Sequence, residues 1–451
     1  VMMLSTLARV TQGRQVGQDV EFDAVSIDTR TLRSGDLFVA LSGPNFDGHD
    51  YIGAAREKGA CAAIVARQVD MDLPQVVVAR PASALGEMAA WWRGCFDIPL
   101  VAVTGSNGKT SVKEMLAAIF SRASDHVLAT HGNLNNDLGV PLTLMRLRDS
   151  HDYAVIEMGM NHPGELTYLT GLARPDVAII TNASAAHLEG VGGLEDVAHA
   201  KGEILSGLSE NGIAVLNADD PFFSLWTELA GAHRVISFAA DNAAEVTADY
   251  ALHADSVRMH IQSPWGSDEC TLAVAGKHNV SNALAAAAAA GAAGVSIDDI
   301  TAGLASWQGV KGRLQRSQLG NVQLIDDSYN ANPASLKASI DVLARQPGTR
   351  LLVMGDMKEL GADAADLHAG IGELAAQAGI DGLFGLGELT RLTCNAFGSE
   401  ARHYADHAGL SADLLARLSE LTGPVTVLVK GSRSMQMERI AADLTTGLGG
   451  N

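Results

Sequence analysis

The chain has 451 residues, of which 47% are hydrophobic, and 52 acidic against 32 basic residues give a formal net charge of −20 at pH 7. This length exceeds a single hydrophobic core, so we expect about three domains. The apolar content excludes a disordered or fibrous protein, and the acidic charge disfavours nucleic acid and anionic membranes as partners. The four cysteines lie far apart without paired spacing, which indicates neither a zinc site nor a disulfide framework.

Residues 1–82 alternate short apolar runs, such as 37–41 and 61–65, with clusters of turn residues. This pattern predicts a small N-terminal α/β domain. The start of the chain lacks a basic segment followed by an apolar core, and the longest apolar run, 283–295, is too short to span a bilayer. We therefore expect a cytoplasmic protein without membrane insertion.

Residues 83–312 are predicted to form a central domain. A helical stretch over 82–96 leads into an apolar run typical of a strand buried in a parallel sheet. Strands alternating with helices predict a doubly wound sheet, with the apolar runs at 100–103, 153–156, 177–180 and 213–216. Tighter alternation over 245–274 predicts a small antiparallel addition to this domain.

Residues 313–451 show a second alternating series and predict a Rossmann-like C-terminal domain. Its expected strands are 322–325, 351–354, 383–386 and 425–429. The fold class expected for the whole chain is therefore α/β, in three domains.

The clearest local signal is a glycine-rich segment between the apolar run 100–103 and a helical stretch, and its sequence is Thr104-Gly105-Ser106-Asn107-Gly108-Lys109-Thr110. Glycines let backbone N–H groups surround phosphates at a helix N-terminus, a lysine reaches the β- and γ-phosphates, and a threonine hydroxyl can bind Mg²⁺. Val103 stands where the full P-loop pattern has its first glycine. An ordinary glycine-rich turn is the alternative, and the strand before and helix after disfavour it.

Polar residues follow other predicted strands. Glu157 ends the run 153–156, where it can meet a Mg²⁺ bound by Thr110, although a solvated acid is the alternative. Lys201 falls on the apolar stripe of a helix beginning near Leu194 and should face inward, unless it snorkels to the edge of the core. A lone loop histidine such as His187 is more often without a special role.

Three further clusters lie near predicted helix starts. Asn279, within 277–282, could bind a base or a phosphate or could cap its helix. The segment 326–333 carries more hydrogen-bonding residues than a turn needs and ends at a proline suited to a first helical turn. Lys430 and Arg433 suit a carboxylate or phosphate, and a solvated basic turn is the alternative.

Together these segments resemble the Mur ligases over essentially the whole chain, in the order TGSNGKTS, NLNNDLGVP, EMGMNHPGE, TNASAAHLEG, HAKGEI, GKHNVSNA, GRL, DDSYNANP and VKGSRSM. The DDSYNANP and KGSRS forms are typical of members that add D-alanyl-D-alanine. An Asp-Asn-Pro-Arg segment would resemble the diaminopimelate-adding members of the family. The sequence contains no such segment, which disfavours those members. The resemblance implies an ATP-dependent ligase of peptidoglycan synthesis that joins D-alanyl-D-alanine to UDP-N-acetylmuramoyl-tripeptide through an acyl phosphate. A monomer is the simplest expectation.

The resemblance also implies roles for individual residues. It places ATP at Gly105, Ser106, Asn107, Gly108, Lys109, Thr110, Ser111, Asn279, Asn282, Arg313, Asp327 and Asn330. It implies two Mg²⁺, one on Thr110 and Glu157 and one on His187 and a carbamylated Lys201, whose added carboxylate is the ligand type that Mg²⁺ prefers. Catalysis would rest on Lys109, Glu157, His187 and Lys201. The UDP-substrate would contact Ser26, Thr29, Arg30, Asn135 and Asn136, and an acceptor carboxylate would contact Lys430 and Arg433.

Two other functions remain open on the sequence. A folylpolyglutamate synthase shares the phosphate loop and a Rossmann-like last domain, but it should lack the N-terminal module seen in residues 1–80. A P-loop switch or motor would release phosphate without an amine acceptor. The dependence of phosphate release on D-alanyl-D-alanine therefore separates these functions.

Overall fold

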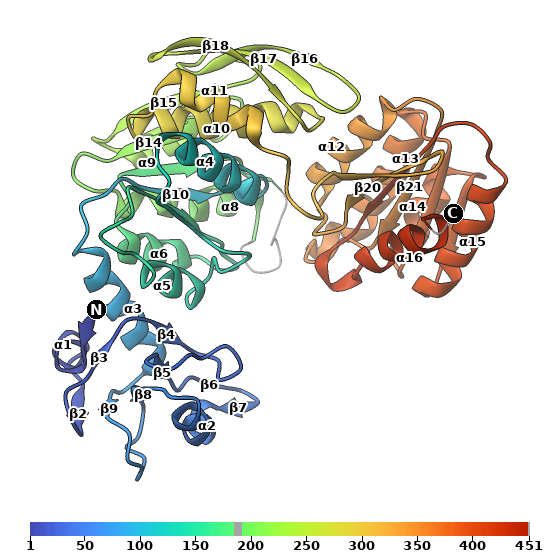
Figure 1. The fold of residues 1–451 in the computed structure, drawn as a ribbon. Coiled ribbons are helices and arrows are strands. Elements are labelled where there is room, and N and C mark those ends of the chain that lie inside the picture. Colours follow the sequence, from blue (N-terminus) through green and yellow to red (C-terminus); the bar gives the residue numbers. More distant parts are fainter. Residues whose placement is uncertain (185–191, 450–451) are drawn as a thin grey trace.

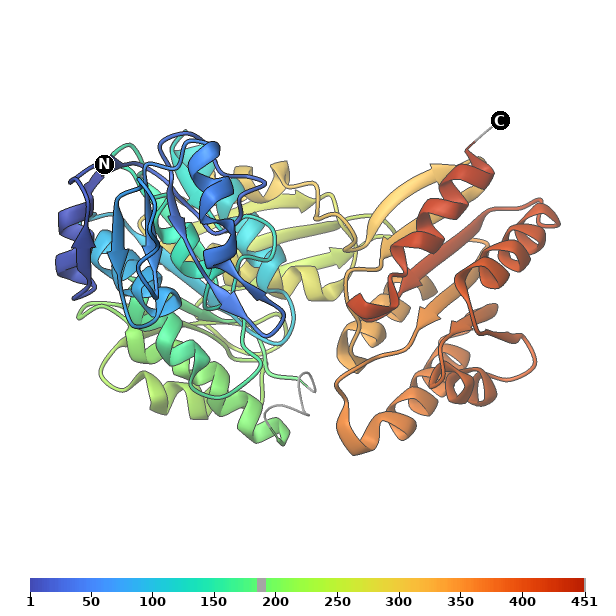
Figure 2. The same cartoon turned by 90° about the horizontal axis from the view of Figure 1, so that it is seen from below.

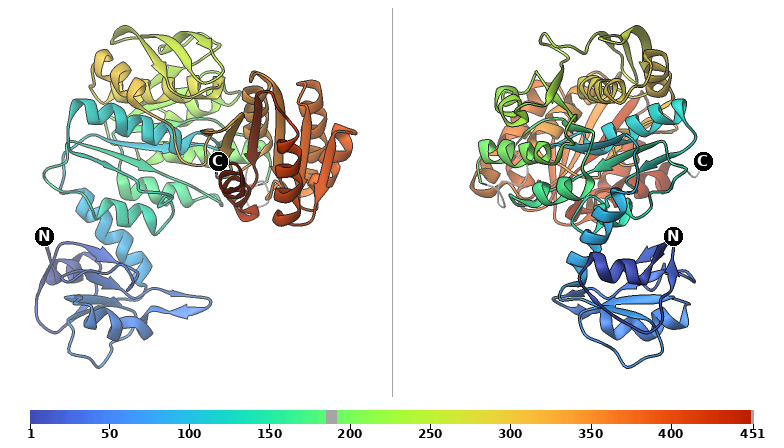
Figure 3. Two further views of the ribbon diagram at one scale, coloured as in Figure 1. Left: turned by 45° about the vertical axis from the view of Figure 1, so that its right-hand side comes forward. Right: turned by 90° about the vertical axis from the view of Figure 1, so that its left-hand side faces the viewer.

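The computed structural model describes residues 1–184 and 192–449. Three lobes follow one another along the chain, and each is built around its own β-sheet (Figure 1). This arrangement confirms the predicted α/β class. The N-terminal lobe lies below the central lobe in the views of Figures 1 and 3. The C-terminal lobe lies beside the central lobe, as the view from below in Figure 2 also shows.

The N-terminal lobe contains a five-stranded sheet in the order β2-β9-β8-β5-β4. The strands are β2 (Arg14–Val16), β4 (Val25–Ser26), β5 (Leu37–Val39), β8 (Ala62–Val65) and β9 (Gln75–Val77). Two short pairs accompany them, β1 (Met2–Met3) with β3 (Glu21–Phe22) and β6 (Ser42–Gly43) with β7 (Phe46–Asp47). Its helices are α1 (Leu4–Val10), the 3-10 turn η1 (Gly48–Tyr51) and α2 (Ile52–Glu57).

The central lobe contains a six-stranded parallel sheet in the order β11-β12-β10-β13-β14-β15. The strands are β10 (Leu100–Thr104), β11 (Val127–Ala129), β12 (Tyr153–Glu157), β13 (Val177–Ile180), β14 (Ile213–Asn217) and β15 (Arg234–Phe238). Successive residues of β10 point to opposite faces, and each face packs into a separate hydrophobic core. Both faces are therefore buried, which explains why these strands are apolar throughout.

Helices cover both faces of this sheet. One core takes in α3 (Pro81–Arg93), α5 (Gly139–Leu144), α6 (Glu165–Ala173), α8 (Leu194–Gly202), the 3-10 turn η2 (Glu203–Gly207) and α9 (Phe223–Ala230). The other takes in α4 (Lys109–Ala123), α10 (Lys277–Ala292) and α11 (Ile297–Ser306). The predicted antiparallel addition is confirmed as β16 (Thr247–Leu252), β17 (Val257–Ser263) and β18 (Gly266–Leu272).

The C-terminal lobe contains a six-stranded sheet in the order β19-β20-β24-β21-β22-β23, in which only β19 is antiparallel to its neighbour. The strands are β19 (Gln315–Leu319), β20 (Val322–Asp327), β21 (Thr349–Gly355), β22 (Gly382–Leu386), β23 (Ala401–Tyr404) and β24 (Val425–Lys430). Its helices are α12 (Pro333–Ala344), η3 (Gly361–Asp363), α13 (Ala364–Gln377), α14 (Thr390–Phe397), α15 (His407–Ser419), η4 (Arg433–Met435) and α16 (Glu438–Leu448). The predicted boundary after residue 312 stays a prediction, and it falls between α11 and β19.

The topology of the central sheet indicates where a ligand binds. The chain leaves β12 on one side of β10 and continues at β13 on the other side, so the direction of winding reverses at β10. Ligands of open α/β sheets bind outside the carboxyl ends of strands at such a switch point. Within residues 1–184 and 192–449, no helix is both long and apolar enough to cross a membrane.

Candidate active site

The phosphate loop follows β10 and requires both of its glycines. Gly105 and Gly108 have φ angles of 149° and 84°, in the region that L side chains rarely adopt. A Cβ on Gly105 would lie 1.8 Å from Oγ1 of Thr181, and one on Gly108 would lie 2.3 Å from Oδ1 of Asn282. The sequence therefore places glycine where both the backbone angle and the neighbouring side chains exclude any other residue.

Neighbouring strands hold this loop in place. Thr181, just after β13, donates from Oγ1 to the carbonyl of Asn107 at 2.6 Å, and the amide of Asn107 donates to Oδ1 of Asn182 at 3.0 Å. Lys109 begins α4 and donates from Nζ to the carbonyl of Gly105 at 2.7 Å. Burial lowers the pKa of Lys109 to about 8. Thr110 and Ser111 follow in the first turn of α4.

Glu157 ends β12 beside this loop and is 2% exposed. Its backbone amide donates to Oγ1 of Thr130 at 2.9 Å, and its Oε1 accepts from Nδ2 of Asn135 at 2.9 Å. Its Oε2 is buried and has no hydrogen-bond partner within the described part of the chain. A buried carboxylate oxygen left in this way fits a divalent cation, because Mg²⁺ prefers such oxygen ligands. Both Glu157 and Lys109 line the same cavity.

Lys201 lies at the end of α8 and is 1% exposed, so the prediction that it faces inward is confirmed. Helix α8 ends at Gly202, directly after Lys201, and the chain continues as η2. Burial, and secondly the positive charge of Lys109, lower the pKa of Lys201 well below its usual value. Its neutral form is thereby favoured, as reaction with CO₂ to a carbamate requires. His187 lies outside the described residues.

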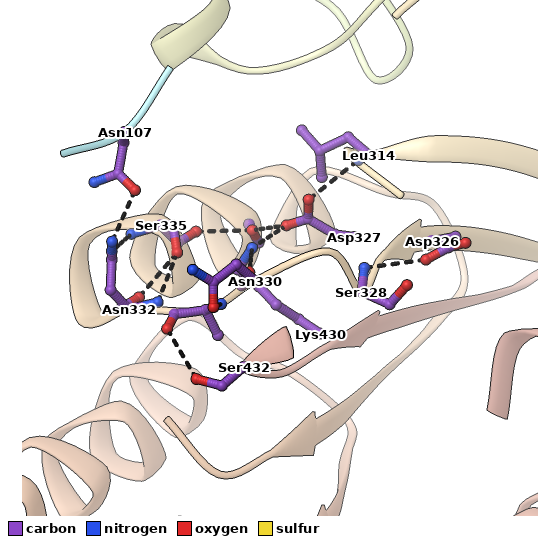
Figure 4. Close-up of polar contacts among 12 residues, drawn as sticks. Asn107, Leu314, Asp326, Asp327, Ser328, Asn330, Asn332, Ser335, Lys430 and Ser432 are labelled. Atoms are coloured by element: carbon purple, nitrogen blue, oxygen red, sulfur yellow. Dashed lines mark hydrogen bonds and ion pairs between the residues drawn. The ribbon is translucent and has the colours of Figure 1, made fainter. Parts of the chain in front are cut away.

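The C-terminal lobe reaches the phosphate loop through two side chains. Arg313 donates from Nη2 to Oγ1 of Thr110 at 3.2 Å, and its guanidinium lies 4.5 Å from the ring centre of Tyr329. Asn332 donates from Nδ2 to Oδ1 of Asn107 at 2.8 Å (Figure 4). The structure therefore brings Arg313 and Asn332 against the phosphate loop, and the role of Arg313 toward ATP stays a prediction.

Lys430 and Asp327 form a buried ion pair at the ends of two neighbouring strands, β24 and β20 (Figure 4). Nζ of Lys430 lies 2.6 Å from Oδ2 of Asp327 and donates to the carbonyl of Asn330 at 2.9 Å. Oδ2 of Asp327 also accepts from Oγ of Ser339 at 2.6 Å, and its Oδ1 accepts from the amide of Leu314 at 3.2 Å. Both charges are thus satisfied inside the domain. The ammonium of Lys430 would have to give up Asp327 before it could bind a substrate carboxylate, so Lys430 is poorly suited to that role.

Arg433 is exposed, unlike Lys430, and lines the cavity. Its Nη1 donates to Oε1 of Glu438 at 2.8 Å, and its backbone amide lies 3.4 Å from Oδ1 of Asn330. A surface pair of this kind contributes little free energy, so the guanidinium remains available to a ligand.

Asn279 is not the N-cap that the sequence left open. The N-cap of α10 is Gly276, and Asn279 lies in the first turn, where its Nδ2 donates to the carbonyl of Ala275 at 2.8 Å. Its Oδ1 accepts from Nδ2 of Asn282 at 3.3 Å. Asn282 lies against Gly108 of the phosphate loop, and Asn279 contacts the loop only through Asn282.

The residues predicted for the UDP-substrate divide between a smaller cavity and the main cavity, which Asn135 and Asn136 line. Ser26 lines a smaller cavity of about 190 Å³ between the N-terminal and central lobes, with Arg146 and Arg148 opposite. Arg30 is exposed and bound to Asp28, and its hydrogen bonds lower the pKa of that carboxyl to about 2. Thr29 lies outside the lining of this smaller cavity.

The main cavity has a volume of about 1130 Å³ and is shared by the central and C-terminal lobes. Its lining includes residues that the sequence reasoning missed, namely Arg80, Tyr168, Lys358 and Glu359. Lys358 and Glu359 lie in the segment that follows β21, after Asp356 and Met357, and Glu359 has a φ of 63°. The rule that polar residues after an apolar strand mark a site would have found them. Arg80 likewise follows β9, after Val78 and Ala79, whereas Tyr168 lies within α6 and carries no such signal.

Comparison with known proteins adds three family models. They match residues 21–93 (Mur ligase family, catalytic domain), 103–290 (Mur ligase middle domain) and 312–433 (Mur ligase, glutamate ligase domain). The chain is 46% identical over 444 residues to the UDP-N-acetylmuramoyl-tripeptide--D-alanyl-D-alanine ligase of Escherichia coli, covering 98% of each chain.

Solved structures agree with this family. A crystal structure of MurF from Acinetobacter baumannii is 37% identical, with a TM-score of 0.93 and 98% of both chains covered. MurF from Thermotoga maritima in complex with ADP is 30% identical, with a TM-score of 0.83, and the match covers 94% of this chain and 98% of that one. The matched family models span most of the chain and lie in the order in which its three sheets occur. The chain therefore belongs to the Mur ligase family.

Proposed function

We propose that this chain is the ATP-dependent ligase that joins D-alanyl-D-alanine to UDP-N-acetylmuramoyl-tripeptide. The proposal is supported by the similarity to the relatives and by one observation on the structure. A single cavity is lined by the phosphate loop, by Glu157 and by cations of the C-terminal lobe. An enzyme that activates a carboxylate with ATP and then transfers it to an amine needs these groups around one space. Its location in the cytoplasm and a monomeric state belong to the same proposal.

ATP would bind with its phosphates at the N-terminus of α4. Backbone N–H groups of residues 105–110, Lys109 and Arg313 would offset the phosphate charge. Thr110 and the unpartnered oxygen of Glu157 would hold one Mg²⁺, which when bound neutralises phosphate charge. We assign a second Mg²⁺ to Lys201 as its carbamate and to His187. The lysine's burial and lowered pKa support its half of that assignment.

The reaction would proceed in two steps. The terminal carboxylate of the tripeptide attacks the γ-phosphorus, which forms an acyl phosphate and releases ADP. The amine of D-alanyl-D-alanine then attacks the acyl carbon, and the tetrahedral intermediate expels inorganic phosphate as the amine loses a proton. Lys109 and Arg313 would stabilise the charge that moves onto the bridging oxygen during transfer.

The acceptor carboxylate would bind Lys358 and Arg433 rather than Lys430. Both side chains line the C-terminal wall of the cavity, whereas Lys430 is committed to Asp327. The side chain of Lys358 is 48% exposed, although its Nζ also lies 3.0 Å from Oδ2 of Asp356. Lys358→Met should therefore raise KM for D-alanyl-D-alanine and leave KM for ATP unchanged. Equal changes in the two KM values would mean that Lys358 does not contact the acceptor specifically.

The uridine nucleotide would bind at the smaller cavity. Ser26 and the backbone of Asp28 supply hydrogen-bonding groups on one wall, and Arg146 on the other wall could meet the diphosphate. The muramoyl-peptide would then extend from this cavity toward the phosphate loop.

Phosphate release tests the proposed function. The assay contains ATP, Mg²⁺ and UDP-N-acetylmuramoyl-tripeptide, with and without D-alanyl-D-alanine, and mass spectrometry follows the joined product. Release that requires both substrates, with product at the summed mass less water, supports the ligase. Release without the dipeptide would indicate a P-loop switch or motor. A second assay replaces the two substrates with a folate and glutamate, and product formed only there would indicate a folylpolyglutamate-type enzyme.

A further inference from the structure

Asn135 binds the acid assigned to Mg²⁺, although the resemblance implied a contact with the UDP-substrate. Its Nδ2 donates to Oε1 of Glu157 at 2.9 Å. The backbone carbonyl of Asn135 accepts from the amide of Gly159 at 2.8 Å, two residues beyond the acid. Thr130 fixes the backbone amide of Glu157 from the same side of the strand. The acid is therefore held at its backbone and at one carboxylate oxygen.

The other carboxylate oxygen receives no such support. Oε2 of Glu157 is buried and lacks a hydrogen-bond partner in residues 1–184 and 192–449. Leaving a buried acceptor without a partner costs about 1–3 kcal/mol, and such groups are rare away from functional sites. Because the amide of Asn135 is neutral, it fixes the carboxylate without cancelling its charge. An arginine or lysine there would fix the carboxylate equally well but would compete with a cation.

From this geometry we infer that Asn135 is a positioning residue, which turns the carboxylate of Glu157 so that Oε2 faces a divalent cation. The packing supports one orientation of the amide. A carboxylate only accepts hydrogen bonds, so Asn135 must present its nitrogen to Glu157. Its oxygen then lies against Gly159, where an added Cβ would come within 3.0 Å. A glycine at 159 thus leaves room for this orientation.

The next residue in the chain provides a matched control. Asn136 is also an amide, but its Oδ1 accepts from the backbone amide of Gly139 at 2.8 Å, at the start of α5. Replacing Asn136 should therefore affect the local structure of α5 and not the carboxylate of Glu157. A comparison of neighbouring alanine variants separates the loss of a positioning contact from a general loss of local order.

The inference rests on the proposed function only in that a divalent cation binds at Glu157, so the test measures the cation directly. Mn²⁺ is titrated against the whole protein in the presence of a non-hydrolysable ATP analogue, and free Mn²⁺ is followed by electron paramagnetic resonance. Loss of a residue that orients a metal ligand typically weakens metal binding about 10–100-fold. We expect this increase in Kd for Asn135→Ala, no change beyond about twofold for Asn136→Ala, and a larger loss for Glu157→Gln.

The outcomes separate the two proposals. If Asn135→Ala binds Mn²⁺ like the wild type but raises KM for the UDP-substrate, Asn135 contacts substrate and the inference is wrong. If Glu157→Gln binds Mn²⁺ normally, the cation lies elsewhere and the inference fails with it. Failure of the wild type to form product, with the Asn135 effect on Mn²⁺ intact, overturns the proposed function alone. Asn135→Ser, which is too short to reach Glu157, replaces the alanine variant if circular dichroism shows that Asn135→Ala does not fold.

Discussion

Two polar regions face the same cavity, and they differ in how their charges are satisfied. At the phosphate loop, Lys109 has carbonyl oxygens as its hydrogen-bond partners, and Glu157 keeps one buried oxygen without a partner in the described chain. At the end of the C-terminal sheet, Lys430 and Asp327 bond directly to each other. Both regions follow apolar parallel strands and contain the same kinds of residue.

The difference separates a site built for a ligand from a site built for the fold. Charges that are buried without a direct bond to an opposite charge cost free energy in the empty protein, and a bound ligand of opposite charge recovers that cost. A lysine and an aspartate that neutralise each other gain nothing comparable from a ligand. The phosphate loop should therefore govern activity, and the Asp327–Lys430 pair should govern stability.

The largest expected effect follows from replacing Lys109. Lys109→Met removes a cation that would offset phosphate charge, and loss of one such group typically lowers kcat on the order of 10²–10³-fold. Stability should be largely kept, because the ammonium of Lys109 is buried and bonds directly to carbonyl oxygens, and the charge of Glu157 acts on it without a direct hydrogen bond in the described chain. Turnover is measured by phosphate release and folding by thermal unfolding. The exposed Lys337 on α12 provides a control, since Lys337→Met should leave both measurements unchanged. Normal turnover of Lys109→Met would mean that this lysine does not bind the phosphates of ATP.

The opposite result is expected for the ion pair. Lys430→Met leaves the buried carboxylate of Asp327 without its cation, which should lower the free energy of unfolding by about 3–5 kcal/mol. The double variant Asp327→Asn/Lys430→Met removes both charges and should recover part of the loss. Urea denaturation of the two single variants and the double variant measures the coupling. Additive losses would mean that the two side chains do not stabilise each other, and the contrast between the regions would disappear.

The pH dependence of stability gives a smaller effect with a defined sign. Burial lowers the pKa of Lys109 to about 8 in the folded chain, from 10.5 for an exposed lysine, so between these pH values the unfolded chain binds more protons. The free energy of unfolding of the ligand-free protein should therefore rise with pH across this window. Lys109→Met should show a shallower rise, because the lowered pKa of Lys201 remains. Identical slopes for the variant and the wild type would contradict the buried, ligand-free state of Lys109.

Sequence patterns predicted the parts of this structure that depend on local chemistry. The apolar strands, the phosphate loop and the acid at the end of β12 follow from residue order, because strand ends and helix starts are set by neighbouring residues. The buried position of Lys201 followed from helical periodicity in the same way. Family resemblance was needed to assign roles to Asn135 and Arg313.

Contacts between distant segments could not be predicted in this way. Lys430 and Asp327 are 103 residues apart, and only the register of β24 beside β20 shows that each neutralises the other. The hydrogen bond from Asn135 to Glu157 depends likewise on the packing of the segment after β11 against β12. Sequence alone gives the residue types at such places but not which ones bond to each other.

The smallest expected effect tests the contact that joins the two regions. Asn332 caps α12 by accepting from the amide of Ser335 at 2.8 Å and also donates to Asn107 of the phosphate loop. Asn332→Ser keeps a good N-cap but cannot reach Asn107, whereas Asn332→Ala loses both contacts. The free energy of unfolding should stay within about 0.5 kcal/mol for serine and fall by about 1 kcal/mol for alanine. One neutral hydrogen bond is worth about 1 kcal/mol, so KM for ATP should rise about fivefold in both variants. A wild-type KM for Asn332→Ser would mean that the C-terminal lobe caps its own helix there without supporting the phosphate loop.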